Sequence, residues 1–174
     1  MNRKVLYLAH AAVIAALYVA LTQLAASLGL ASAAIQVRFS EALTILPVFT
    51  SAAIPGLFVG CILANLLTGS VPLDVLFGSI ATLLGAFGTY YLSHPSRKNI
   101  SGFDLKSWQR WLSPIPPIAA NTLIVPFILA YVYQFEGSIP YFMLTVGTGE
   151  VISCGVLGLL LLNVLERYRR YIFV

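Results

Sequence analysis

Long, nearly uninterrupted runs of apolar residues dominate the pattern along this chain. They predict six helical segments, at residues 5–30, 40–54, 55–68, 72–92, 115–135 and 141–165. A helix needs roughly 20 apolar residues to cross a bilayer, and the first, fourth, fifth and sixth segments reach that length. The second and third segments are shorter. They are predicted to form a hairpin that turns at residues 53–56, because Pro55-Gly56 is a helix-breaking pair.

Composition supports a membrane location for these helices. The chain is 59% hydrophobic and only 9% charged, with a mean hydropathy of +0.90. Soluble domains carry about a quarter charged residues, so this chain has too few polar groups to cover a surface in water. We therefore expect an all-α integral membrane protein, a six-transmembrane-helix bundle that forms a single domain over residues 1–174. The first apolar run exceeds the roughly 7–15 residues of a signal-peptide core, so it is interpreted as a retained helix.

The positions of lysine and arginine predict the orientation of the bundle. Nine of the ten basic residues precede the first segment, follow the last one, or lie between the fourth and fifth: Arg3, Lys4, Arg97, Lys98, Lys106, Arg110, Arg167, Arg169 and Arg170. Basic residues favour the cytoplasmic side of a membrane. With six spans, both termini and all nine residues are predicted to be cytoplasmic. The tenth, Arg38, is then the exception on the outer side.

Several classes of enzyme and cofactor site lack support in the sequence. There is no GxxxxGK[ST] phosphate-binding loop and no HExxH metal motif. Cys61 and Cys154 lie within apolar segments and are interpreted as small buried residues. His10 and His94 are predicted toward the cytoplasmic side, away from the acidic residues. We therefore expect no cofactor, no metal and no enzymatic activity in this chain.

The stretch IQVRFSEALTILP, residues 35–47, places Arg38 and Glu41 three residues apart beside an apolar segment. If the second helix begins this early, the two residues share one helical face. Arg38 could neutralise Glu41 or extend to the lipid headgroups. Alternatively, both residues belong to a ligand-binding loop on the outer side. Glu41 is the better candidate for direct contact with a ligand.

Glu150 is the most deeply placed charged residue. It lies nine residues into the last segment, which at ~1.5 Å per residue is roughly 13–14 Å below the outer end. A carboxylate at this depth costs at least a few kcal/mol and therefore suggests a functional site, although it could also only tie helices together. Gly147 and Gly149 flank it and would let a ligand or another helix approach the backbone.

Other polar residues are predicted to join Glu150 in the outer half of the bundle. Asp74, at the start of the fourth segment, could be a ligand contact or only a favourable N-terminal carboxylate. Asn65 and Asn121 could bind a ligand or link helices, and Asn121 is expected to lie deeper. Gln36 is expected at the outer rim, where tyrosines such as Tyr133 are interpreted as an interfacial belt. Three carboxylates with one arginine suit a small polar or cationic ligand.

The first segment contains closely spaced small residues. Ala11, Ala12, Ala15 and Ala16 form overlapping pairs separated by three or four positions. Such pairs let two helices pack closely in lipid. They could pack within this bundle or form a docking surface for another membrane protein. The pair Gly56 and Gly60 is interpreted as internal packing.

Three stretches together resemble a known family. VRFSEALTILPVFTSAAIPGLFVGCILANLLTG, LDVLFGSIATLLGA and GTGEVIS are similar to the QueT family of queuosine-precursor transporters, which are substrate-binding S components of energy-coupling factor (ECF) transporters. The similarity runs from about residue 4 to residue 167. It implies a six-helix protein of the bacterial cell membrane that captures its substrate from outside. It also implies partners, namely a transmembrane coupling subunit and two ATPase subunits, with Ala11, Ala12, Ala15 and Ala16 matching the docking motif.

The resemblance further implies a 7-deazaguanine substrate such as queuine or its aminomethyl precursor. We expect Glu150 and either Glu41 or Asp74 to accept hydrogen bonds from the base and its amine. Asn65, Gln36 or Arg38 would then donate to the carbonyl. Two other functions remain open on the sequence alone. The chain could be an S component or a small secondary transporter for another polar molecule, with Glu150 as the proton or ligand site, or it could be a structural membrane subunit.

Overall fold

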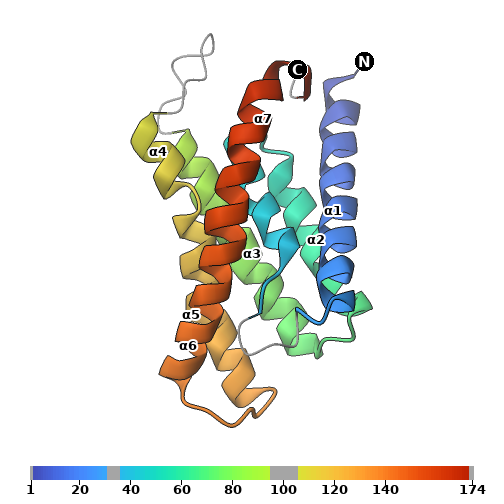
Figure 1. Ribbon diagram of the computed structural model, residues 1–174. Coiled ribbons are helices and arrows are strands. Elements are labelled where there is room, and N and C mark those ends of the chain that lie inside the picture. Colours follow the sequence, from blue (N-terminus) through green and yellow to red (C-terminus); the bar gives the residue numbers. More distant parts are fainter. Residues whose placement is uncertain (1, 31–35, 95–105, 173–174) are drawn as a thin grey trace.

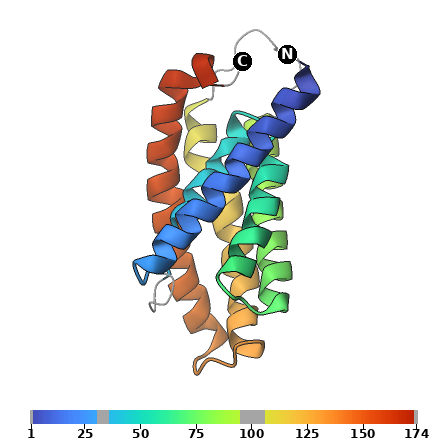
Figure 2. The same ribbon diagram turned by 90° about the vertical axis from the view of Figure 1, so that its right-hand side faces the viewer.

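A computed structural model (Figures 1 and 2) describes residues 2–30, 36–94 and 106–172 of the chain. Within these ranges the fold is helical and contains no strand. The helices in chain order are α1 (Arg3–Ser27), the 3₁₀-helix η1 (Phe39–Val48), α2 (Ala53–Leu67), α3 (Pro72–Ser93), α4 (Ser107–Leu112), α5 (Ile115–Tyr131), α6 (Ile139–Glu150), the π-helix η2 (Val151–Leu157) and α7 (Gly158–Ile172).

In the part of the chain that the structure describes, four helical stretches are long and apolar enough to cross a membrane: Arg3–Ser27, Pro72–Ser93, Ser107–Tyr131 and Ile139–Tyr168. Two shorter apolar helices, Phe39–Val48 and Ala53–Leu67, complete the bundle. The predicted all-helical membrane architecture is thereby confirmed. Each of the six predicted segments corresponds to one of these stretches, and the last is continuous through α6, η2 and α7.

The turn between the second and third segments lies earlier than predicted. η1 ends at Val48 and α2 begins at Ala53, so the chain turns at residues 49–52 rather than 53–56. Pro55 lies in the first turn of α2, where a proline removes no helical hydrogen bond and its fixed φ favours the helix. The sequence-based prediction placed the break at Pro55-Gly56 and was wrong by a few residues for this reason.

η1 lies at the centre of the bundle. Every residue from Ser40 to Val48 is buried, and the helix contacts α1, α2, α3, α7 and η2. Its 3₁₀ conformation winds more tightly than an α-helix, with three residues per turn. A charged residue on this helix therefore has no route to solvent or lipid except through a cavity.

α1 crosses the bundle obliquely and packs closely on α2 (Figure 2). The contact depends on glycine, because a Cβ added at Gly60 would lie 2.9 Å from Tyr18 Cβ and 3.0 Å from Ala15 Cα. The interpretation of the Gly56 and Gly60 pair as internal packing is confirmed. The alanines of α1 divide between two faces. Ala15 is buried against α2, whereas Ala12 and Ala16 are exposed on the opposite side.

Both chain termini lie at one end of the bundle, together with α4 (Figure 1). We call this the terminal end and the opposite one the loop end. α4, which was not predicted, is held there by a salt bridge from Arg110 to Glu166 of α7. Arg3 and Arg167 also lie at the terminal end, as the topology prediction requires. Arg97 and Lys98 lie outside the described residues, and the assignment of this end to the cytoplasm remains a prediction.

The α1–α2 contact yields a first prediction. Replacing Gly60 with valine forces α1 away from α2 and should destabilise the protein by about 1–3 kcal/mol, the usual cost of overpacking. Thermal unfolding of the purified protein in detergent measures the effect. Ala16→Val adds a similar volume to the exposed face of α1 and is the matched control. An equal loss of stability in both variants would contradict the proposed role of Gly60.

Candidate functional site

A large cavity occupies the loop end of the bundle. It has a volume of about 780 Å³ and lies between the end of α1, the α2–α3 link, the end of α5 and the start of α6. We call it the chamber. Aromatic residues Tyr133, Phe135, Tyr141 and Phe142 line part of its wall. Its volume falls within the range of about 300–1,000 Å³ that is typical of small-molecule sites.

A much smaller cavity lies deeper in the bundle. It has a volume of about 30 Å³ and is lined by Glu41, Glu150 and Asn121, among others. We call it the inner cavity. Gln36, Arg38 and Asp74 line both cavities. These shared residues therefore form the boundary between the chamber and the two carboxylates beneath it.

Glu41 lies in the first turn of η1 and is only 2% exposed. Its Oε1 accepts a hydrogen bond from the Tyr18 hydroxyl of α1. Its Oε2 accepts one from Asn121 Nδ2 of α5 at 3.4 Å. Buried carboxylates require such partners, because an unpaired charge in a low-dielectric interior is very costly. Two separate helices therefore hold Glu41 in place.

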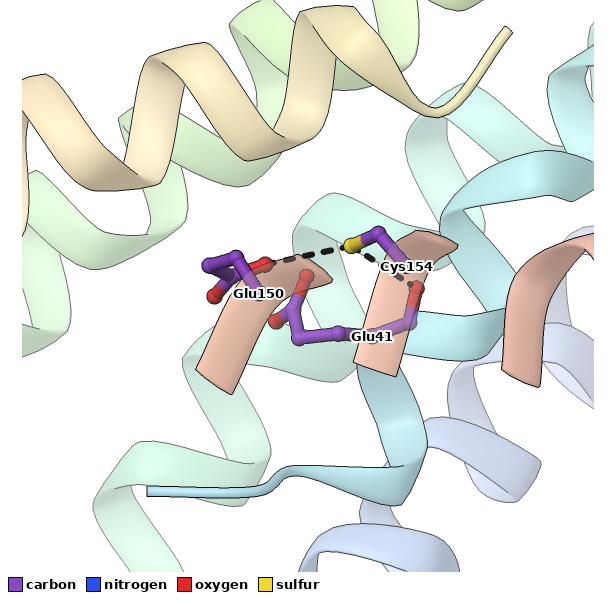
Figure 3. A group of neighbouring side chains, drawn as sticks. All are labelled: Glu41, Glu150 and Cys154. Atoms are coloured by element: carbon purple, nitrogen blue, oxygen red, sulfur yellow. Dashed lines mark hydrogen bonds between the residues drawn. The ribbon is translucent and has the colours of Figure 1, made fainter. Parts of the chain in front are cut away.

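Glu150 ends α6 and lies beside Glu41 (Figure 3), and both residues line the inner cavity. Cys154 Sγ donates to Glu150 Oε2 at 3.1 Å and lies 3.4 Å from the Glu41 carbonyl oxygen. One ligand atom from each of Glu41, Glu150 and Cys154 lies within 4.8 Å of the others. This spacing would admit a small cation. Tyr18, Asn121 and Cys154 already donate to the two carboxylates, however, so the group is built foremost as a set of hydrogen-bond acceptors.

The segment that leads into η1 lies directly against α6 and η2. The Gln36 carbonyl oxygen occupies the space that a Cβ at Gly149 would need. The backbone N–H of Arg38 donates to Ser153 Oγ in the π-helix at 3.2 Å. Close approach at Gly149 was expected from the sequence, and the approaching group is this backbone. π-Helical turns often occur at functional sites, and here the turn places Ser153 beside Arg38.

Arg38 differs from its expected arrangement with Glu41. It is the N-cap of η1 with extended backbone, at φ −109° and ψ 110°, so it precedes the helix rather than sharing a helical face with Glu41. Among the described residues the salt bridge found is Arg110–Glu166, and Arg38 forms none with Glu41. A shared face was expected only if the helix began early enough to include Arg38, and the helix begins one residue later. Arg38 instead lines both cavities.

Asp74 links the chamber to its rim. It lies in the first turn of α3, is 8% exposed, and accepts a hydrogen bond from Tyr133 Oη at 2.9 Å. The same Tyr133 oxygen accepts from the Val71 N–H at 3.3 Å. Partial burial, together with the neighbouring Asp74 carboxylate, raises the pKa of Tyr133. Tyr133 was interpreted as interfacial belt, but its hydroxyl joins two loop-end elements.

The remaining predicted residues also face these cavities. Asn65, on α2, is buried, lines the chamber and donates to Cys61 Sγ at 3.4 Å. Asn121 was expected to lie deeper in the bundle than the other polar residues. It lies at the inner cavity, where its Nδ2 donates to Glu41. The structure thus gathers the seven predicted residues around two adjoining cavities: Gln36, Arg38, Glu41, Asn65, Asp74, Asn121 and Glu150.

Sequence reasoning missed Tyr18 and Cys154 as partners of the carboxylates. Cys154 had a usable signal, because it lies four residues after Glu150 and therefore on the same helical face. Tyr18 had none, since its contact with Glu41 depends on the angle at which α1 crosses the bundle.

Comparison with known proteins completes this description. Neither the curated proteins nor the solved structures contain a significant match. Among protein families, residues 8–167 match the family described as QueT transporter. The match covers nearly the whole chain and includes every residue of the site. The chain therefore belongs to the QueT transporter family.

Proposed function

We propose that this protein is the substrate-capture S component of an ECF importer in the bacterial cell membrane, and that its substrate is a 7-deazaguanine base. The observation that carries the proposal is the pair of buried carboxylates, Glu41 and Glu150, beneath a chamber at the loop end. Membership of a transporter family supports a transported ligand. The paired acceptors then indicate which chemistry that ligand presents.

The charge balance of the site favours a donor-rich ligand. Among the described residues, the two cavities are lined by a single arginine, Arg38, and by four carboxylates: Glu41, Asp74, Glu136 and Glu150. A 7-deazaguanine base offers an N1–H and an exocyclic amine along one edge, which a carboxylate accepts in a bidentate manner. An aminomethyl group adds a cation for a second carboxylate. Of the two candidates for that second role, Glu41 lies beside Glu150, and Asp74 lies at the boundary with the chamber.

The carbonyl of the base requires a donor from the same boundary. Gln36 and Arg38 line both cavities, and Asn65 lines the chamber. Arg38 is the strongest donor of the three because its guanidinium is charged. In this proposal Arg38 serves the ligand carbonyl rather than Glu41, which already has hydrogen bonds from Tyr18 and Asn121.

Binding at the carboxylates requires the inner cavity to widen. Its volume of about 30 Å³ corresponds to about two water molecules, at roughly 10–15 Å³ each. A bicyclic base is several times larger. Val125 and Val146 line both cavities, so their separation would join the two spaces. In this proposal the ligand enters the chamber first and then opens the path to Glu41 and Glu150.

The proposed transport uses partners, which would supply the nucleotide-binding loop that this sequence lacks. In the proposed complex, a transmembrane coupling subunit docks on α1, and two ATPase subunits drive transport. Exposure on α1 favours two of the four predicted docking residues. Ala12 and Ala16 are exposed, whereas Ala15 is buried against α2 and Ala11 is partly buried. We assign the docking surface to Ala12 and Ala16.

The Glu150→Gln variant tests the binding site. It keeps the shape of the side chain but removes the charge, and hydrogen bonds to charged groups contribute about 1.5–3 kcal/mol. We expect the affinity for 7-aminomethyl-7-deazaguanine to fall about 10- to 100-fold, measured by calorimetry on purified protein. Glu166→Gln makes the same change at the terminal end, outside both cavities, and is the matched control; it should lose less than about threefold. Unchanged affinity in Glu150→Gln would refute the role of Glu150.

The Ala16→Leu variant tests the docking surface. A bulky side chain on the exposed face of α1 should block the coupling subunit without reaching the cavities. We expect ligand binding to be unchanged and uptake into proteoliposomes that contain all partner subunits to fall at least tenfold. Ala119→Leu makes the same change at an exposed position of α5 and is the matched control, which should leave uptake unchanged. ATP-independent uptake by the wild-type chain alone would contradict the S-component proposal and favour a secondary transporter.

A further inference from the structure

α1 reaches the candidate site through two adjacent hydrogen bonds. The Tyr18 hydroxyl donates to Glu41 Oε1, and Tyr18 is only 1% exposed. One turn further along α1, Thr22 Oγ1 is hydrogen-bonded to Ser40 Oγ at 2.8 Å. Ser40 and Glu41 are consecutive residues in the first turn of η1. α1 is therefore attached at the point where η1 presents its carboxylate.

Glu41 has few other supports. Its Oε2 accepts from Asn121 at 3.4 Å, which is a long hydrogen bond. The Tyr18 hydroxyl is therefore the stronger partner of this carboxylate. A ligand that donates to Glu41 must either share the carboxylate with Tyr18 or reorient it. In both cases the ligand and α1 act on the same carboxylate group.

The opposite side of α1 leaves the bundle. Tyr18 and Ala15 are buried, whereas Ala12, Ala16 and Leu17 are exposed. The two faces belong to one continuous helix that packs on α2 through Gly60, where there is no free space for a side chain. A rigid helix in close contact on one side responds to a force as a unit. A displacement of α1 at Tyr18 would therefore move the exposed face as well.

We propose that Tyr18 is the positioning residue of the site: it holds the Glu41 carboxylate toward the ligand and transmits ligand occupancy to α1. Thr22 supports it by holding Ser40. This inference rests on the proposed function of Glu41 as a ligand acceptor. It goes further in assigning α1 two linked roles, one at the binding site and one at the exposed face.

Tyr18→Phe tests the positioning role, because it removes one hydroxyl and keeps the ring. With 7-aminomethyl-7-deazaguanine as the probe, we expect affinity to fall about tenfold. Tyr7→Phe is the matched control, since Tyr7 is on the same helix and its hydroxyl contacts Ser51 O at 3.3 Å instead. It should leave affinity unchanged. Equal affinities in wild type and Tyr18→Phe would overturn the proposal.

A double-mutant cycle shows whether Tyr18 acts through Glu41. Residues in one hydrogen-bond network give non-additive effects. We therefore expect Tyr18→Phe to cost less than about twofold in a Glu41→Gln background, against about tenfold in the wild type. A purely structural role would lower affinity equally in both backgrounds and would refute the inference. If Tyr18→Phe does not fold, Thr22→Val replaces it in the same cycle. We expect Thr22→Val to lower the affinity about threefold in the wild type and by less in the Glu41→Gln background. Unchanged affinity in Thr22→Val would overturn the proposal.

A fluorophore on α1 tests transmission directly. Leu8→Cys places it on an exposed position of the helix, and the native Cys61 and Cys154 are buried. Saturation with 7-aminomethyl-7-deazaguanine should change the fluorescence emission of the protein that keeps Tyr18. It should leave the emission of Tyr18→Phe unchanged. The same change in both would refute transmission through Tyr18. If the wild type does not bind the probe at all, the proposed function fails, whereas binding without any effect of Tyr18→Phe rejects only this inference.

Discussion

The burial of one carboxylate inside a helical bundle determines much of this structure. Glu41 lies on η1, whose residues from Ser40 onward are enclosed by neighbouring helices. An unpaired charge there would be very costly, so the surrounding helices must supply donors. α1 supplies Tyr18 and α5 supplies Asn121. The need to satisfy Glu41 therefore constrains where two of the long helices lie, and those two helices also form walls of the chamber.

The close packing around η1 depends on residues without side chains at the contact points. Gly60 lets α1 approach α2 closely enough for Tyr18 to reach inward, and Gly149 admits the backbone of Gln36. A methyl group at either position would move an element that lines the site. Packing and polar geometry are thus coupled, and a change in one displaces the other. The substituted positions need not contact any ligand to alter its binding.

Sequence patterns were sufficient for the helices and for most of the polar site. Hydrophobic run length located six segments, and the scarcity of polar residues made Glu41, Asp74 and Glu150 individually conspicuous. The same reasoning misplaced the turn before α2, since proline is tolerated in a first helical turn as well as in a loop. It also missed α4 and the donor Tyr18. Contacts of that kind depend on helix crossing angles, which hydrophobic periodicity does not encode.

The separation of the two cavities bears on how such a site would select its ligand. The inner cavity is small, and there Glu41 and Glu150 accept hydrogen bonds from three protein donors: Tyr18, Asn121 and Cys154. A ligand that enters must replace any donor it displaces, because an acceptor left unpaired in the interior costs about 1–3 kcal/mol. A base with both an N–H and an amine on one edge meets that requirement. A base of the same shape without the amine would not, so on the proposed function discrimination would arise from unsatisfied acceptors rather than from size.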